Sequence, residues 1–220
     1  ICVPLRIHGK VLGVIEIVNI EDMDLFRSRK LPILTILADY AAIAIENARL
    51  FSRIERMSVT DEYTGLYNAR YLYRTLDGVL RRSGDEDKPA AVVFIDIDNF
   101  KEVVDSRGHL LGSQALKEIG TVILDALDPD DILIKYGGDE YVIILPRKNK
   151  KKTRKTIERV RRAVRENEYL GSTGKPVLVT ASFGAAFFPE DGRDEKSLLL
   201  AADRRMYRIK NADKDGIFID

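Results

Sequence analysis

Four acidic side chains in two short segments have the types and spacing to bind a cation. Asp96 and Asp98 follow the apolar run 90–95, and Asp139 and Glu140 follow a pair of glycines later in the chain. Carboxylates at the end of an apolar strand are costly unless they are solvated or bound to a cation. If the strands are neighbours, Asp96, Asp139 and Glu140 converge on an oxygen-ligand site that suits Mg²⁺. Such a cation recruits phosphates, so a nucleoside triphosphate is the natural ligand.

The elements that must position these acids are a buried strand and a hairpin. Gly137-Gly138 lies between two apolar segments, 132–136 and 141–145, and adjacent glycines favour a tight turn. The two acids that follow the glycines are then expected to project from the hairpin tip. The other interpretation of the first acidic segment is a simple turn, because Asp98-Asn99 is good turn and helix-capping chemistry.

The remaining pattern predicts helices that alternate with strands. We expect an α/β (α+β) sandwich in which helices flank a central, mostly antiparallel sheet. The predicted helices cover about 68–82, 112–127, 150–168 and 195–211, and the predicted strands cover 90–96, 132–136, 141–145, 176–187 and 216–219.

Composition narrows the classes of partner. The 36 basic and 35 acidic side chains give a net charge of +1, so no nucleic-acid polymer is expected as a partner. Cys2 is the one cysteine, which excludes a disulfide framework and fits a reducing, cytoplasmic location. No apolar run in residues 1–220 reads as a membrane span or a signal peptide.

The N-terminal quarter predicts a sheet fragment and a long helix. Two short strands, 3–7 and 11–18, flank a turn at Gly9, and a helix is expected over 25–58. The helix carries a stripe with coiled-coil spacing, so we favour a homodimer helix over an ordinary core-facing one. We therefore divide the chain into 1–24, 25–58 and 59–220. The stripe consists of Ile33, Leu37, Tyr40, Ala44, Asn47, Phe51 and Ile54.

Five motifs in order resemble those of the GGDEF nucleotidyl cyclases, over about 58–220. The segment 137–141, GGDEY, is similar to the GGDEF signature, and 61–68, DEYTGLYN, is similar to the opening D-x-L-T-G-L-x-N. The segment 94–101, FIDIDNFK, resembles the metal and phosphate segment, and 180–184 and 202–210 resemble the closing motifs. Residues 1–50 resemble the end of a GAF sensor domain.

The resemblance implies a cyclase-like palm in which two domains, each with one triphosphate, face each other. Each 3′-hydroxyl attacks the other nucleotide's α-phosphate, so that two pyrophosphates leave and a cyclic dinucleotide forms. It further implies Mg²⁺ or Mn²⁺, two ions per half-site, and assigns roles to individual residues. Asp96, Ile97, Asp139 and Glu140 are the metal residues; Asp139, Glu140 and Lys101 are the catalytic residues; Asn99, Phe100, Lys101, Lys210 and Lys214 are the phosphate residues.

The base pocket departs from the family pattern F-K-x-x-N-D-x-x-G-H-x-x-G-D. The Asn that reads guanine is Val104 and the final Asp is Ser113, whereas His109 keeps its place. A Ser hydroxyl donates or accepts, so the pocket loses its selection against adenine. This resembles the hybrid promiscuous (Hypr) branch and predicts that ATP and GTP are both substrates, with cyclic GMP-AMP as a product. The alternatives are a plain diguanylate cyclase and an inactive nucleotide-binding module.

A second departure concerns product feedback. Many family members carry R-x-x-D shortly before the signature as an inhibitory site for the product. The matching segment here is 128–131, and Asp128 takes the place of the arginine. We therefore expect weak binding of product at this position.

Overall fold

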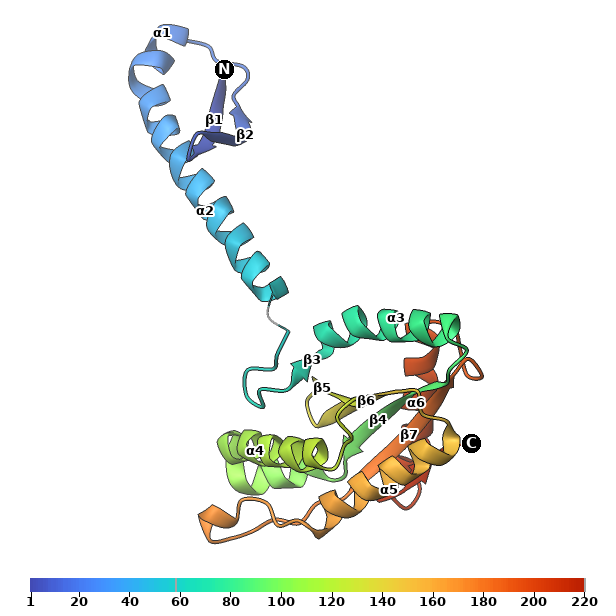
Figure 1. Cartoon of the computed structure of the whole chain (residues 1–220). Coiled ribbons are helices and arrows are strands. Elements are labelled where there is room, and N and C mark those ends of the chain that lie inside the picture. The colour runs from blue at the N-terminus through green and yellow to red at the C-terminus, as the bar shows by residue number, and fades with distance from the viewer. Residues whose placement is uncertain (58, 220) are drawn as a thin grey trace. The chain divides into compact units, whose positions relative to one another are not determined.

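The computed structural model of the chain describes residues 1–57 and 59–219 (Figure 1). Within it, the chain divides into two compact units, residues 1–58 and 59–220.

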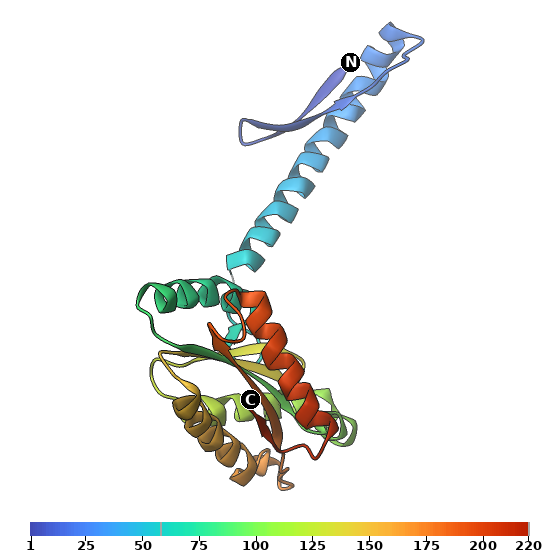
Figure 2. The same cartoon turned by 90° about the vertical axis from the view of Figure 1, so that its right-hand side faces the viewer.

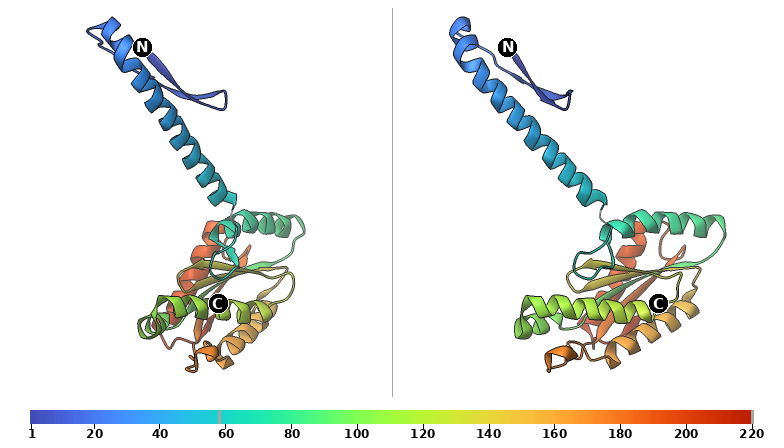
Figure 3. Two further views of the ribbon diagram at one scale, coloured as in Figure 1. Left: turned by 90° about the vertical axis from the view of Figure 1, so that its left-hand side faces the viewer. Right: turned by 60° about the vertical axis from the view of Figure 1, so that its left-hand side comes forward.

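The N-terminal unit is a β-hairpin that packs on a helix. Strands β1 (Cys2–Ile7) and β2 (Lys10–Glu16) pair antiparallel. A short helix α1 (Met23–Leu25) and a π-helical turn (Phe26–Lys30) lead into α2 (Leu31–Met57). The hairpin lies beside the first half of α2 (Figure 3), where Ala38 and Ala42 are fully buried. All seven residues of the predicted stripe are exposed on α2.

One helix of this unit is long and apolar enough to cross a membrane. It spans Met23–Phe51, and only 11% of its most apolar window is buried. The sequence analysis looked for an apolar run without interruption; this helix has the necessary length and mean hydropathy although Asp39 and Glu46 interrupt its apolar residues. Length and composition alone do not separate a membrane span from a helix that packs on a partner.

The larger unit is built on a six-stranded sheet in the order β3-β5-β6-β4-β7-β8. The central pairs β5–β6, β6–β4 and β4–β7 are antiparallel, and only the edge strands β3 and β8 pair in parallel. The strands are β3 (Tyr67–Asn68), β4 (Ala90–Ile97), β5 (Ile132–Gly137), β6 (Glu140–Pro146), β7 (Ala181–Phe188) and β8 (Ile217–Phe218).

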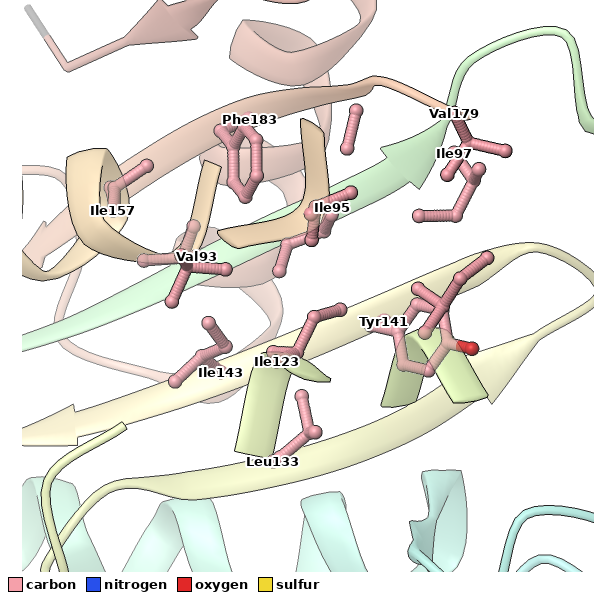
Figure 4. Packing of buried hydrophobic residues seen from close by; sticks show 14 of the residues in the cluster. Val93, Ile95, Ile97, Ile123, Leu133, Tyr141, Ile143, Ile157, Val179 and Phe183 are labelled. Atoms are coloured by element: carbon pink, nitrogen blue, oxygen red, sulfur yellow. The ribbon is translucent and has the colours of Figure 1, made fainter. Parts of the chain in front are cut away.

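Two helices cover each face of this sheet, as Figure 2 shows. Helices α3 (Ala69–Asp85) and α6 (Glu195–Asn211) bury one face, and α4 (Phe100–Asp125) and α5 (Lys150–Glu166) bury the other. Every residue of β4 is buried, because alternate side chains enter the two cores. Figure 4 shows the α4/α5 side, where Val93 and Ile95 lie near Ile123 and Phe183. The predicted α/β sandwich with a mostly antiparallel sheet is confirmed.

Two predicted boundaries were wrong. The second helix of this unit begins at Phe100 rather than near residue 112, and Gly108 (φ 81°, ψ 163°) interrupts it. A glycine within a helical segment is typical of a break, so the sequence indicated a helix only after Gly108 and not over residues 100–107. The strand predicted over 176–187 begins only at Ala181, because Val177 instead forms an isolated bridge with Tyr169.

Candidate active site

The acidic end of the sheet is assembled by strand register. In the antiparallel pair β4–β6, Asp96 lies directly opposite Glu140, and on the other side of β4 it lies opposite Ser182. Cross-strand partners point to the same face, so the two carboxylates lie together on the face that α6 covers. The Ile97 amide donates to the Asp139 carbonyl at 3.2 Å, which fixes the hairpin tip to the end of β4.

Lys210 of α6 reaches this pair of carboxylates. Its Nζ donates to Asp96 Oδ2 at 2.6 Å. Burial raises the pKa of Asp96 to about 6; the hydrogen bond from Lys210 opposes this shift, and the charges of Asp139 and Glu140 add to it. Burial also raises the pKa of Glu140, with further contributions from Asp139 and Asp203. The site therefore concentrates negative charge that one ammonium group only partly balances.

The oxygens at this end fit a hard cation. Asp96 Oδ1 is buried and has no hydrogen-bond partner among the described residues. A carboxylate oxygen in that state, beside a second carboxylate, is suited to Mg²⁺. However, no three acidic, histidine or cysteine side chains of the described residues come close enough to form a metal cluster. The expected three-carboxylate cluster of Asp96, Asp139 and Glu140 is therefore not formed among the described residues. Asp96 and Glu140 are strand partners, and Asp139 lies in the turn before Glu140.

A buried lysine that the sequence analysis did not single out holds the hairpin turn. Lys135 of β5 donates from Nζ to the carbonyl of Gly137 at 2.7 Å and to that of Gly138 at 2.5 Å. Burial lowers the pKa of Lys135, although the carboxylates of Asp61, Asp139 and Glu140 counteract it. The available signal was a lysine inside the otherwise apolar run of β5. Its role here is to fix the backbone from which Asp139 and Glu140 project.

The predicted phosphate segment lies where β4 passes into α4. Asn99 adopts a left-handed conformation (φ 55°) immediately before the helix. Lys101 is exposed in the first turn of α4, and Phe100 is buried. The Lys214 ammonium donates to the Asn99 side chain. Amides at a helix N-terminus favour anions, so this segment retains the features of a phosphate site.

Asp98 has a structural role rather than a ligand role. Its carboxylate accepts hydrogen bonds from Thr180 and Ser182 at 2.7 Å each and from the Asp215 amide at 2.9 Å. It therefore ties the end of β4 to β7 and to the segment before β8. The sequence analysis had considered Asp98 as part of a cation site or as a turn residue, and neither interpretation predicted this role.

A cavity of about 460 Å³ opens beside the signature turn. Of the three predicted base-binding residues, Ser113 lines it, whereas Val104 and His109 do not. Val104 instead packs over Gly112, where an added Cβ would lie 3.0 Å from the valine methyl group, and His109 is exposed beyond the Gly108 break. The full lining is Asp61, Tyr63, Thr64, Asn68, Ala69, Arg70, Ser113, Leu116, Lys135, Tyr136, Gly137 and Gly138.

The segment that matches the inhibitory product site is occupied by ion pairs within the chain. Asp128 accepts from Lys148 Nζ at 2.6 Å and from Arg159 at 2.7 Å. Lys148 also bonds the buried Asp131 at 2.6 Å. Asp128, which stands where the family has an arginine, is thus paired with Lys148 from the loop between β6 and α5 and with Arg159 from α5.

Comparisons with known proteins agree with this geometry. PleD, a response regulator of Caulobacter vibrioides, is 31% identical over 162 residues, which are 73% of this chain and 36% of that protein. Diguanylate cyclase A of Treponema denticola is 28% identical over 98% of this chain and 58% of that protein. The chain thus spans roughly a third to three fifths of the length of these relatives.

Solved structures show the same fold. The GGDEF domain of YfiN (TpbB) from Pseudomonas aeruginosa matches with a TM-score of 0.68 at 28% identity, over 70% of this chain and 96% of that one. The coiled coil and GGDEF domain of DgcB from Caulobacter crescentus, in complex with c-di-GMP, matches with a TM-score of 0.68 at 25% identity, over 84% of this chain and 98% of that one.

The family described as "Diguanylate cyclase, GGDEF domain" matches residues 58–216, which contain the paired acids, the signature turn and the cavity beside it. This chain therefore belongs to the GGDEF family of diguanylate cyclases, which are nucleotidyltransferases.

Proposed function

We propose that residues 59–220 form a nucleotidyl cyclase that joins two GTP molecules into cyclic di-GMP. The observation that carries this proposal is the pairing of Asp96 with Glu140 in register, with an oxygen of Asp96 buried and without a hydrogen-bond partner in the described part of the chain. Relatives named as diguanylate cyclases support GTP as the substrate. In each half-reaction a 3′-hydroxyl attacks an α-phosphate, one phosphodiester bond forms and one pyrophosphate leaves.

The residues divide this work between metal binding, phosphate binding and positioning. Asp96, the Ile97 carbonyl and Glu140 would hold Mg²⁺ or Mn²⁺, the ions that diguanylate cyclases use, and we propose two ions per half-site with Asp139 beside the second. Such ions neutralise phosphate charge and lower the pKa of the attacking hydroxyl. The α4 N-terminus, Lys101 and Lys214 orient the phosphates. Lys210, which donates to Asp96, would also contribute positive charge toward the distal phosphates.

A second candidate is that ATP is also accepted, with cyclic GMP-AMP as a mixed product. The observation that favours it is Ser113, which lines the cavity where the family pattern has an Asp. An Asp accepts hydrogen bonds from the ring N–H and amino group of guanine, and it repels the ring acceptor that adenine has there. A hydroxyl interacts with either base, so the selection against adenine is lost.

We also propose that two chains act together through α2, and that the N-terminal unit is the end of a GAF-type sensor domain in a cytoplasmic enzyme. The support is the stripe with coiled-coil spacing, which is exposed along α2 on the side away from Ala38 and Ala42. Pairing two helices along this stripe would bring two catalytic domains onto one dimer. Analytical ultracentrifugation of the wild type and of a Tyr40→Glu, Phe51→Glu variant tests this, because two charges on the stripe should convert a dimer into monomers.

One reaction tests the proposed activity. The protein is incubated with Mg²⁺ and equimolar ATP and GTP, and the products are resolved by mass. Cyclic di-GMP alone supports the diguanylate cyclase, and a mixed cyclic GMP-AMP supports the second candidate. The absence of any dinucleotide, from protein shown to be dimeric, contradicts both and favours a nucleotide-binding module without activity.

Weak product feedback is part of the proposal. Because Asp128 is paired with Lys148 and Arg159, a negatively charged cyclic dinucleotide meets an acid rather than a free cation at this position. Initial rates of pyrophosphate release should therefore change little when micromolar cyclic di-GMP is added. Strong inhibition that a Lys148→Met, Arg159→Met variant abolishes would contradict this expectation.

A further inference from the structure

The cavity beside the signature turn holds one aromatic side chain from the loop 59–66. Tyr63 lines it and is 68% exposed, so its ring is available to a ligand. The same lining includes Ser113 from α4 and Gly137 and Gly138 from the turn. The cavity therefore brings a ring, a hydroxyl and the signature backbone around one space of about 460 Å³.

The backbone on both sides of Tyr63 is fixed by hydrogen bonds. Asp61 Oδ1 accepts from the Thr64 amide at 2.9 Å and from the Thr64 hydroxyl at 2.7 Å. The Gly65 amide donates to the Asp61 carbonyl at 2.9 Å, and the Asp61 amide donates to the Leu66 carbonyl at 2.7 Å. A ring on a fixed turn loses little conformational entropy when a ligand covers it, so it is a pre-organised contact.

The identity of this residue also departs from the family pattern. The opening motif D-x-L-T-G-L-x-N has a leucine where this chain has Tyr63. A leucine offers apolar area, whereas a tyrosine offers a flat π-face with the dimensions of a base. Stacking on an aromatic ring tolerates any base, because every base has a π-face.

We propose that the Tyr63 ring stacks on the purine of the bound triphosphate and supplies affinity that does not depend on the edge of the base. The inference rests on the proposed nucleotide-binding function of this site. It explains how the pocket would hold either purine with Ser113 in place of the family's Asp, as the second candidate function requires. Guanine and adenine would then both be bound through the face of the ring, whichever base the edge contacts prefer.

Equilibrium binding of GTP, ATP and inorganic tripolyphosphate to the full chain tests this. We compare the wild type with Tyr63→Ala, Tyr63→Leu and Tyr63→Phe. The matched control is Tyr67→Leu, because Tyr67 belongs to the same motif, 61–68, and is 41% exposed, but stacks on Tyr71 and does not line the cavity. Calorimetry with Ca²⁺ in place of Mg²⁺ measures nucleotide binding and does not require turnover. A protein without cyclase activity therefore still tests the stacking of Tyr63, and failure of the cyclase assay is a separate result.

Tyr63→Ala should weaken both purine triphosphates by about 10- to 100-fold, the range for stacking one base. Tyr63→Leu should lie between Ala and the wild type, Tyr63→Phe should bind as the wild type does, and Tyr67→Leu should change affinity little. Tripolyphosphate has no base, so its affinity should stay constant in all variants. Wild-type affinity for GTP and ATP in Tyr63→Ala would overturn the inference. So would a loss confined to one of the two nucleotides, or an equal loss for tripolyphosphate.

Discussion

The two ends of the nucleotide site differ in how much of the family pattern they keep. At the acidic end, Asp96 and Glu140 face each other across two central strands, and Lys210 reaches them from α6. At the base end, the cavity is lined by Tyr63 and Ser113, and both depart from the pattern. Few residue types can bind the cations that neutralise phosphate charge, so the acidic end allows little change. A purine can be bound through hydrogen bonds to its edge or by stacking on its face, so more residue types suit the base end. The acidic end thus keeps the residues of the family pattern, whereas the residues proposed to meet the base depart from it.

The largest expected effect comes from the acidic end. Glu140→Gln keeps the size of the side chain but removes the negative charge of the residue opposite Asp96 in the strand pair. We expect turnover to fall by at least about 100-fold, because a metal residue near the reacting hydroxyl is lost. Pyrophosphate release under saturating Mg²⁺ and GTP measures it.

The matched control for that substitution is Glu190→Gln, which only breaks an exposed ion pair with Lys150. It should leave turnover within about twofold of the wild type, because exposed pairs contribute little. If Glu140→Gln keeps wild-type turnover, then the carboxylate of Glu140 is not needed for the reaction and the acidic end is not the catalytic end of the site.

The second effect concerns how α6 is placed. Gly184 of β7 lies directly under this helix, and an added Cβ would lie 2.2 Å from both the Ala202 carbonyl oxygen and the Met206 amide nitrogen. Gly184→Ala should cost about 1–3 kcal/mol of stability through overpacking, and should lower activity because Lys210 is on the displaced helix. Thermal unfolding and turnover are measured together.

Gly78→Ala is the matched control, because Gly78 lies within α3 and an added Cβ would meet nothing within 4 Å. That change should raise stability by about 0.5–1 kcal/mol, since alanine favours the helix. If Gly184→Ala is as stable as the wild type, then the close approach of α6 to β7 does not set the position of Lys210.

The base end should respond in selectivity rather than in rate. Ser113→Asp restores an acceptor for the guanine ring N–H and places a negative charge against the adenine ring acceptor. We expect the ratio of kcat/KM for GTP over ATP to rise by about 10- to 100-fold, as for other hydrogen-bonded base contacts. Ser113→Ala, which removes the hydroxyl without adding a charge, should move this ratio far less. If the ratio is unchanged in Ser113→Asp, then residue 113 does not contact the base.

The sequence predicted the acidic end better than the base end for physical reasons. The unbroken apolar run before Asp96 and the paired glycines before Asp139 are local sequence signals of a buried strand and of a tight turn. When these strands pair, Asp96 and Glu140 lie opposite each other. The cavity depends on tertiary packing: Ser113 lines it from α4, whereas Val104 of the same helix packs against Gly112. Lys135 was missed because only the fold shows that its ammonium faces the turn carbonyls.

The smallest expected effect tests the second anchor of α6. Arg205 donates to Asp191 Oδ1 at 2.8 Å and to the Ala185 carbonyl at 2.7 Å, so the helix that carries Lys210 is tied to β7 and the loop after it. Burial alone would raise the pKa of Asp191, but the hydrogen bonds from Arg205 and the Phe187 amide lower it overall. Asp191→Asn should therefore cost about 1 kcal/mol at neutral pH, because the ion pair is only partly buried.

The pH dependence of that cost follows from the direction of the shift. A carboxylate whose pKa is lower in the folded state than in the unfolded state stabilises the fold above the unfolded value, about 3.9. This stabilisation disappears as the pH falls through the lower, folded pKa. The difference in unfolding midpoint between the wild type and Asp191→Asn should thus be full at pH 7 and shrink below pH 4. Asp77→Asn, at an exposed pair with Arg81, should show little difference at either pH. A difference for Asp191→Asn that is equal at pH 7 and pH 3 would mean that its carboxylate charge does not hold α6 in place.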